Sequence, residues 1–212
     1  MHKEVLYHLS FFAETEPIKI PPTLFVEGGA DSLFLKGARG GDFDLFHNMI
    51  VLSNDDGFTA PGLQALRAEI SKIADVIVVA PESEQSAVGH AITLANPLKT
   101  RKVVENGELI GYAVNGTPAD CIKIALTVLL DEPPEMVISG INFGGNLGSC
   151  AIYSGTVSAA TEATIMGIPA FAVSLNTYEN PDFSAAAEFA RKFVPLLLAK
   201  GLPEGVSLNI NV

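Results

Sequence analysis

Two adjacent carboxylates, Asp55 and Asp56, are the residues of this sequence whose types and spacing best suit chemistry. They follow an apolar run at 49–52, which is typical of a buried strand, and they precede a glycine. In open α/β sheets, ligands bind at the carboxyl ends of the strands, where both acids are expected. Neighbouring carboxylates repel each other unless a cation neutralises them, so the pair indicates a divalent metal site. The alternative is that both acids only turn the chain and cap a helix.

Two more oxygen donors follow later strands of the same expected sheet. Ser86 lies in the loop after the apolar run 75–79, and Asn142 lies in a glycine-rich segment after 136–139. Carboxylate, hydroxyl and amide oxygens suit hard cations such as Mg²⁺, Mn²⁺ or Ca²⁺ and argue against zinc. A serine in a loop is more often a turn or cap residue, so Ser86 alone carries little weight. The four candidate metal ligands are Asp55, Asp56, Ser86 and Asn142.

A further segment is suited to an anion. Glycines at 144, 145 and 148 let backbone amides approach an anion closely. Ser154, Gly155 and Thr156 stand at an expected helix start, where free N–H groups and hydroxyls favour a phosphate. The glycine spacing matches neither a dinucleotide-binding fingerprint nor a P-loop, and no Gly-x-Ser-x-Gly elbow is present. His90, close to Ser86, is interpreted as an exposed loop histidine rather than a substrate contact.

The elements that must position these residues alternate along the chain. Apolar runs predict strands at 49–52, 75–79, 94–98, 101–104, 108–114, 136–139, 168–175 and 206–212. Amphipathic spacing predicts helices at 63–73, at 118–130 after the N-cap Thr117, from Ser154 or Thr156 onward, and at 183–198. Asn106-Gly107 predicts a hairpin, with the strands before it away from the main sheet. This order predicts a three-layer αβα fold, a Rossmann-like, doubly wound, mostly parallel sheet with a β-hairpin insertion.

Residues 1–48 do not share this regular pattern. Leu6, Leu9 and Phe12 have the spacing of one or two helical turns, and 24–26 and 32–35 could form short strands. We therefore expect an N-terminal extension of uncertain order at 1–48, followed by an α/β domain at 49–212.

Composition narrows the range of partners. With 24 acidic and 13 basic residues the formal charge is -11, which argues against binding of duplex nucleic acid by a basic face. The two cysteines, Cys121 and Cys150, have no metal-ligand spacing and indicate buried or half-buried thiols in a reducing compartment. No apolar run is long enough to span a membrane, and the first residues do not resemble a signal peptide. We therefore expect a cytoplasmic location and no membrane partner.

Five sequence blocks match one family in order. They are Leu-Ser-Asn-Asp-Asp-Gly (52–57) with Ala-Pro-Gly (60–62), Val-Ala-Pro (79–81), Gly-Thr-Pro-Ala-Asp-Cys (116–121), Ser-Gly-Ile-Asn (139–142) with Asn-Leu-Gly (146–148), and Tyr-Ser-Gly-Thr-Val (153–157). Over about three quarters of its length the chain resembles the SurE family of survival proteins, which are metal-dependent 5′/3′-nucleotidases.

The resemblance implies roles for individual residues. The metal would be held by the same four residues, and one of the two acids, Asp55 or by preference Asp56, would also orient or deprotonate the attacking water. The phosphate would be held by Asn146, Ser154, Gly155 and Thr156. Where the family often has acidic residues this chain has Ser149-Cys150, and 82–85 lacks an often-found basic residue, so substrate preference could differ.

The resemblance also implies an activity and an assembly. We expect a phosphomonoesterase that uses one divalent cation, Mg²⁺ or Mn²⁺ (Ca²⁺ in a crystal), to hydrolyse nucleoside 5′- and 3′-monophosphates. Two alternatives stay open, a phosphoaspartyl intermediate and a non-catalytic nucleotide or metal sensor. Family members usually continue past 208–212 into segments exchanged between subunits, so we expect a missing C-terminal segment and a homo-oligomer, a dimer or a tetramer.

Overall fold

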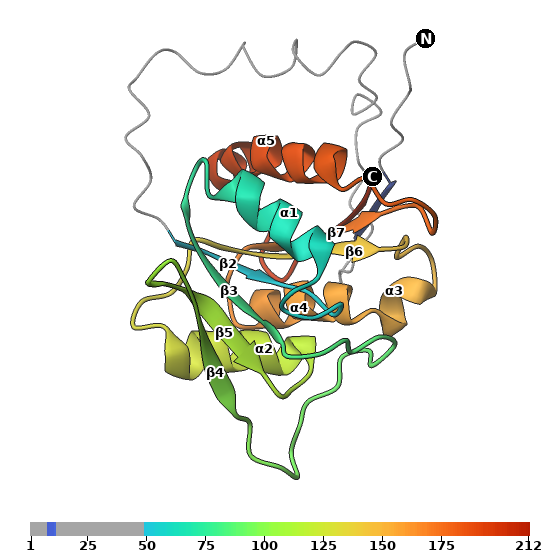
Figure 1. The fold of residues 1–212 in the computed structure, drawn as a ribbon. Helices are drawn as coiled ribbons and strands as arrows, with labels where there is room; N and C mark the ends of the chain where they lie inside the picture. The colour runs from blue at the N-terminus through green and yellow to red at the C-terminus, as the bar shows by residue number, and fades with distance from the viewer. Residues whose placement is uncertain (1–7, 12–48) are drawn as a thin grey trace.

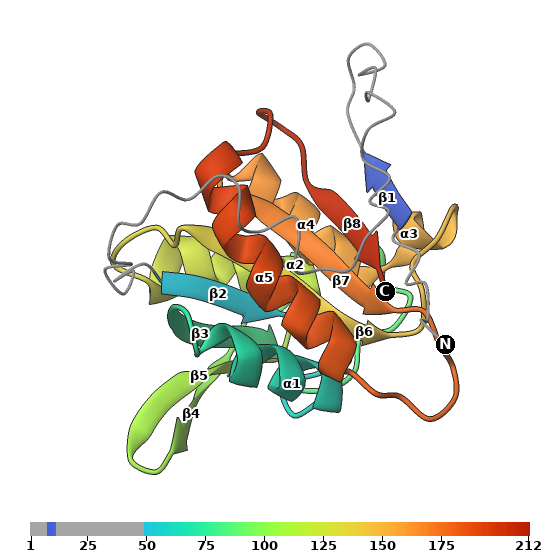
Figure 2. The same ribbon diagram turned by 90° about the horizontal axis from the view of Figure 1, so that it is seen from above.

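An eight-stranded, mostly parallel sheet forms the middle layer of the computed structural model, which describes residues 8–11 and 49–212 (Figure 1). Its strands are β1 (His8–Phe11), β2 (Met49–Ser53), β3 (Asp75–Pro81), β4 (Thr100–Glu105), β5 (Glu108–Val114), β6 (Met136–Phe143), β7 (Ala170–Leu175) and β8 (Leu208–Asn211). Across the sheet the order is β1-β8-β7-β6-β2-β3-β5-β4, as the view from above shows (Figure 2). Only the edge strands β1 and β4 run antiparallel to their neighbours.

Helices cover both faces of this sheet, which confirms the predicted doubly wound αβα architecture. The helices α1 (Pro61–Ile70) and α5 (Ser184–Lys200) lie together on one face, as Figures 1 and 2 show. The helices α2 (Pro118–Ile124) and α4 (Gly155–Ile165) pack together on the other face. A short helix, α3 (Cys150–Tyr153), precedes α4, and a π-helical segment at Ala125–Leu129 continues α2.

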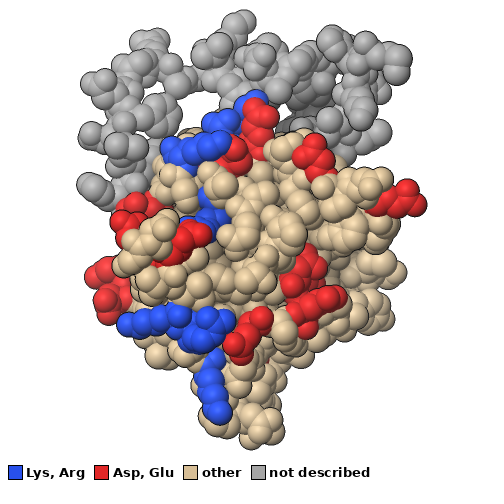
Figure 3. Space-filling model, in the orientation of Figure 1, with Lys and Arg blue, Asp and Glu red and all other residues tan. Residues whose placement is uncertain are grey.

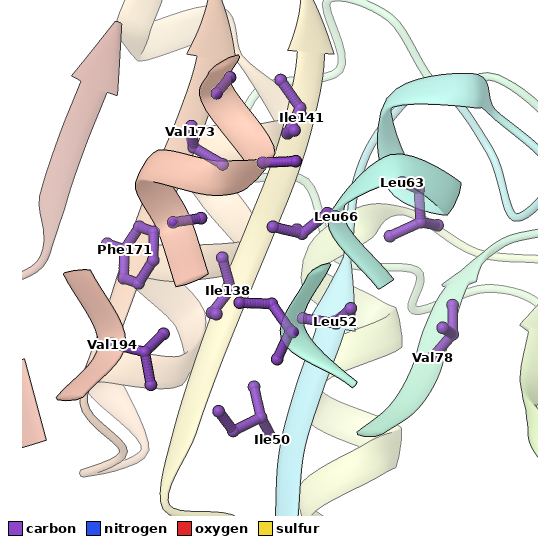
Figure 4. Close-up of a cluster of buried hydrophobic side chains, with 14 of the residues drawn as sticks. Ile50, Leu52, Leu63, Leu66, Val78, Ile138, Ile141, Phe171, Val173 and Val194 are labelled. Atoms are coloured by element: carbon purple, nitrogen blue, oxygen red, sulfur yellow. The ribbon is translucent and has the colours of Figure 1, made fainter. Parts of the chain in front are cut away.

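Alternation along the strands divides the apolar core into two clusters, one on each side of the sheet. Ile50 and Leu52 of β2 belong to the cluster under α1 and α5, which Figure 4 shows. Val51, between them, belongs to the cluster under α2 and α4. Because consecutive strand residues point to opposite faces, a strand buried on both sides must be apolar throughout. A shift of one residue would exchange the two sets of side chains, so burial determines the register.

Several predicted boundaries are wrong. The hairpin does not stand apart from the main sheet, because β5 pairs in parallel with β3 and so makes β4 an edge of the same sheet. Residues 94–98 form no strand. β6 extends four residues beyond its expected end at 139, because Asn142 and Phe143 pair with Ser174 and Leu175 of β7. The helix expected at 118–130 is α-helical only to Ile124, where the π-helical segment begins.

The described part of the N-terminal region is a strand. His8–Phe11 pairs antiparallel with β8, so the helical turn predicted around Leu9 is wrong. The open edge of β8 offers main-chain hydrogen bonds, and these outweigh a weak helical spacing. The short strands predicted at 24–26 and 32–35 lie outside the described residues.

Two further expectations concern the cysteines and membrane-spanning segments. Neither cysteine forms a disulfide, and Cys121 is buried as expected, but Cys150 is exposed. In the part of the chain that the structure describes, no helix combines the length and the apolar character needed to cross a membrane.

Candidate metal and phosphate site

A tight turn at the end of β2 presents the two central carboxylates. The side chain of Asn54 closes this turn through two hydrogen bonds with Gly57. Its Nδ2 donates to the Gly57 carbonyl oxygen at 3.0 Å, and its Oδ1 accepts from the Gly57 amide at 3.2 Å. Asp55 is 5% exposed and Asp56 is half-buried. Asn54 therefore holds the two acids side by side at the carboxyl end of β2, where the sequence predicts them.

Asp55 is pressed against the start of α4. The Thr156 hydroxyl donates a hydrogen bond to Asp55 Oδ1, and the backbone amides of Gly155 and Thr156 are directed at the same carboxylate. A Cβ atom at position 155 would lie 2.7 Å from the Asp55 Cβ, so only glycine permits this approach. The positive end of the helix dipole favours an ionised side chain here. Burial nevertheless raises the pKa of Asp55 above its usual value, against the lowering effect of these hydrogen bonds.

Asp56 lies against the end of β6. Its Oδ2 accepts a hydrogen bond from the Phe143 amide at 3.3 Å. Burial, together with the negative charge of Asp55, raises the pKa of Asp56 from 3.8 to about 6, and Glu84 contributes in the same direction. Among residues 8–11 and 49–212, no ion pair involves Asp55 or Asp56. The site thus concentrates negative charge that the described residues do not neutralise.

The loop after β3 is tied to the same turn. The Gln85 amide donates to the carbonyl oxygen of Asp55 at 2.7 Å, which places Ser86 on a segment bonded to the carboxylate turn. Ser86 itself is exposed, and its hydroxyl donates to Glu84 Oε1 at 2.5 Å. The structure therefore brings this loop to the site, while the Ser86 hydroxyl is bonded to a carboxylate that sequence reasoning did not include.

Asn142 joins the site from β6. Its Nδ2 donates to the Gly144 carbonyl oxygen at 2.7 Å, which leaves Oδ1 as the atom that can face a cation. The following residue, Phe143, is the one whose amide contacts Asp56. Two carboxylates with hydroxyl and amide oxygens on neighbouring segments make a donor set that fits a hard divalent cation. No group of three or more His, Cys, Asp or Glu side chains is arranged around a common metal position within the described ranges.

The residues expected at the phosphate already have protein partners. Asn146 is 7% exposed, and its Nδ2 donates to Ser174 Oγ at 2.9 Å. Its amide donates to Asn211 Oδ1 at 2.7 Å, and its carbonyl accepts from Asn209 Nδ2 at 2.7 Å. Ser154 is the N-cap of α4, with its Oγ accepting from the Val157 amide at 3.1 Å. The helix start is as predicted, but its amides and the Thr156 hydroxyl bind Asp55, so phosphate contact stays a prediction.

Sequence reasoning missed several residues that support the site. Asn209 and Asn211 are buried, and their side chains bind the backbone of Asn146. The alternation of β8 places both on the face opposite Leu208 and Ile210. Two asparagines on a buried strand face were a usable signal, because buried amides need partners. Nothing in the local sequence relates Thr156 to Asp55, since 101 positions separate them.

His90 is an exposed loop histidine, as expected, but its ring has a protein partner. His90 Nε2 lies 2.7 Å from Glu162 Oε2, and Lys123 Nζ lies 2.8 Å from the other oxygen of the same buried carboxylate. Burial alone would raise the pKa of Glu162, but the hydrogen bonds from Lys123 and His90 lower it. The loop is also tied at Thr93, whose hydroxyl donates to the buried Asp120 at 2.6 Å. These contacts hold the loop that carries Ser86 against α2 and α4.

Comparison with known proteins shows what this chain is similar to. A family model described as "Survival protein SurE" matches residues 50–212. The chain is 53% identical over 163 residues to 5′-nucleotidase SurE of Syntrophobacter fumaroxidans and 53% identical over 162 residues to that of Syntrophus aciditrophicus. These matches cover 77% and 76% of this chain, but only 65% and 61% of the relatives.

A solved structure shows the same fold. The SurE protein from Aquifex aeolicus matches with a TM-score of 0.72 and 43% identity, over 77% of this chain and 65% of that one. The chain thus spans less than two thirds of the length of the proteins it matches. Because the family model covers most of the chain, including every residue of the candidate site, this protein belongs to the SurE family.

Proposed function

We propose that the protein is a metal-dependent nucleotidase, which hydrolyses nucleoside 5′- and 3′-monophosphates to nucleoside and phosphate. The observation that carries the proposal is the pair Asp55 and Asp56, two adjacent carboxylates without a cationic partner among the described residues, with the pKa of Asp56 raised to about 6. The relatives named 5′-nucleotidase SurE support it. One divalent cation, Mg²⁺ or Mn²⁺, would relieve the repulsion, and Ca²⁺ could replace it in a crystal.

The proposed ligands are Asp55, Asp56, Ser86 and Asn142, which come from the ends of β2 and β6 and from the loop after β3. When bound, the cation supplies positive charge for a phosphoryl oxygen and lowers the pKa of bound water. Asp55 acts as a fixed ligand, because Thr156 and the start of α4 hold its orientation. Because the Ser86 hydroxyl donates its hydrogen to Glu84, its oxygen lone pairs stay available to the cation.

Asp56 is the better general base of the two acids. It is the more exposed carboxylate and so the more accessible to a water molecule, whereas Asp55 is held by Thr156 and the start of α4. The proposed phosphate-binding residues are Asn146, whose amide and carbonyl are held by Asn211 and Asn209, and Ser154, Gly155 and Thr156 at the start of α4. We expect them to contact the phosphate through groups that their present partners leave available.

The direct test is phosphate release from 5′-AMP and 3′-AMP with Mg²⁺, with Mn²⁺ and with EDTA. We expect release with either metal and none with EDTA, and loss of most activity in Asp55→Asn and Asp56→Asn. Asp75→Asn is the matched control, because it removes the same charge from an exposed residue at the start of β3. Nucleotide binding by calorimetry without release under any metal would contradict the proposal and favour a sensor. An acid-stable, base-labile phosphoenzyme would favour a phosphoaspartyl mechanism instead of water attack.

A further inference from the structure

Exposed aromatic side chains gather beside the carboxylate site. Within residues 49–212, the aromatic residues that are more than about 40% exposed are Phe143 at 41%, Tyr153 at 63% and Tyr178 at 72%. Phe143 follows the candidate ligand Asn142, and Tyr153 precedes the cap of α4. Aromatic side chains usually bury most of their surface, so exposed rings around one site indicate a function other than core packing.

Phe143 is attached directly to the site. Its amide donates to Asp56 Oδ2 at 3.3 Å, so the ring belongs to a residue in contact with the proposed general base. A phosphate ester bound at Asp55 and Asp56 must place its alcohol portion close to the residues around them. In a nucleoside monophosphate, the base is separated from the phosphate only by the sugar. The base therefore lies within reach of residues next to the site, and Phe143 is such a residue because its amide contacts Asp56.

Tyr178 is held beside Phe143 by the local backbone. The two ring centroids lie 6.5 Å apart, with the ring planes inclined at 57°. Gly144, with φ of +104°, lies under the Tyr178 ring, and a Cβ atom there would come within 2.6 Å of Tyr178 Cε1. The Thr177 hydroxyl closes the turn around Tyr178, because it donates to the Glu179 carbonyl at 3.0 Å and accepts from the Glu179 amide at 3.3 Å. The ring is thus exposed but supported.

We propose that Phe143 and Tyr178 bind the nucleobase of the substrate by stacking, and that they make the enzyme prefer purine nucleotides to phosphate esters without an aromatic group. This inference rests on the proposed nucleotidase function and adds to it the recognition of the leaving alcohol. Stacking on aromatic side chains tolerates any base, because every base has a π face. A purine offers the larger face, so it gains more from two rings than a pyrimidine does.

The test compares two substrates that differ only in the base. We would measure kcat/KM for 5′-AMP and for ribose 5-phosphate in wild type, Phe143→Ala, Tyr178→Ala and Tyr178→Phe. Leu109→Ala and Val128→Ala are matched controls, since these apolar residues are 42% and 71% exposed on β5 and on the π-helical segment. Each alanine variant of the pair should lower the ratio of kcat/KM for 5′-AMP to kcat/KM for ribose 5-phosphate by about five-fold or more, the lower end of a base–aromatic stack. Tyr178→Phe should retain the wild-type preference.

A second readout does not depend on hydrolysis. Saturation-transfer NMR would measure contact of the adenine protons of adenosine with the protein, which we expect to fall at least five-fold in Phe143→Ala and Tyr178→Ala and to persist in both controls. Equal losses for 5′-AMP and ribose 5-phosphate, or unchanged values for 5′-AMP, would overturn the inference. If wild type hydrolyses neither ester but binds adenosine through the two rings, the proposed function fails while the base site stands. Absence of adenosine contact in wild type would overturn the base site itself.

Discussion

Asp56→Asn should stabilise the metal-free protein at neutral pH while removing its response to metal. The pKa of Asp56 is raised from 3.8 to about 6 by burial and by the charge of Asp55, so ionising this group costs folding free energy. A difference of roughly two pKa units corresponds to at most about 3 kcal/mol at pH values well above 6, and solvent screening of this partly exposed carboxylate reduces it to about 1–2 kcal/mol. Asparagine has nearly the same shape, carries no charge, and can still accept the Phe143 amide hydrogen bond. For a protein of this size, 1–2 kcal/mol corresponds to about 2–8 °C in Tm.

The pH dependence has a definite sign. Because the pKa of Asp56 is higher in the folded protein than in the unfolded chain, its contribution to stability is fully present below about pH 4 and is lost as the pH rises through 6. The advantage of Asp56→Asn should therefore be largest near pH 7.5, about half as large near pH 5, and small near pH 4.

The assay is thermal unfolding followed by circular dichroism in EDTA at about pH 5 and pH 7.5, repeated with Mg²⁺. Wild type should gain Tm with Mg²⁺, because a ligand that binds only the folded state stabilises it, and Asp56→Asn should gain little. Asp75→Asn, which changes the net charge equally, should behave as wild type in both respects. If Asp56→Asn is no more stable than wild type in EDTA at pH 7.5, Asp56 is not under the electrostatic strain described above. If the variant gains as much Tm from Mg²⁺ as wild type, Asp56 is not a ligand.

Three shorter predictions follow. Thr156→Val removes the hydroxyl that donates to Asp55, a hydrogen bond to a charged group that is worth about 1.5–3 kcal/mol and lowers the pKa of Asp55. The Mg²⁺ affinity measured by calorimetry should therefore fall more at pH 6 than at pH 8. An equal fall at both pH values would mean that the variant leaves the pKa of Asp55 unchanged. Thr117→Ala should lower the free energy of unfolding by about 1 kcal/mol through the lost capping box, with Thr117→Ser as control; lost activity at unchanged stability would instead place Thr117 at the substrate. Light scattering should show a homodimer, and a monomeric mass at high micromolar concentration would refute that expectation.

Much of the fold was predictable because buried parallel strands are apolar on both faces. The short apolar runs at 49–52, 75–79 and 136–139 fit a central strand better than any other element, and the structure has β2, β3 and β6 there. The neighbour of each strand was less predictable. The alternation in 108–114 fits an isolated hairpin as well as an addition to the sheet, and only the main-chain pairing with β3 distinguishes them. Likewise, the end of β6 depends on β7, not on its own residues.

For the site, the sequence by itself determined which oxygen donors stand at the ends of strands, because topology sends the carboxyl ends of parallel strands to one edge. Asp55, Asp56 and Asn142 are found there, and the loop of Ser86 is bonded to Asp55. Only the tertiary structure decided that Thr156 holds Asp55, that Asn209 and Asn211 hold Asn146, and that the Ser86 hydroxyl is bonded to Glu84. A periodic pattern reports which face of an element is buried. The partner of each buried polar group is set by distances between segments remote in the chain, and these exist only once the layers have packed.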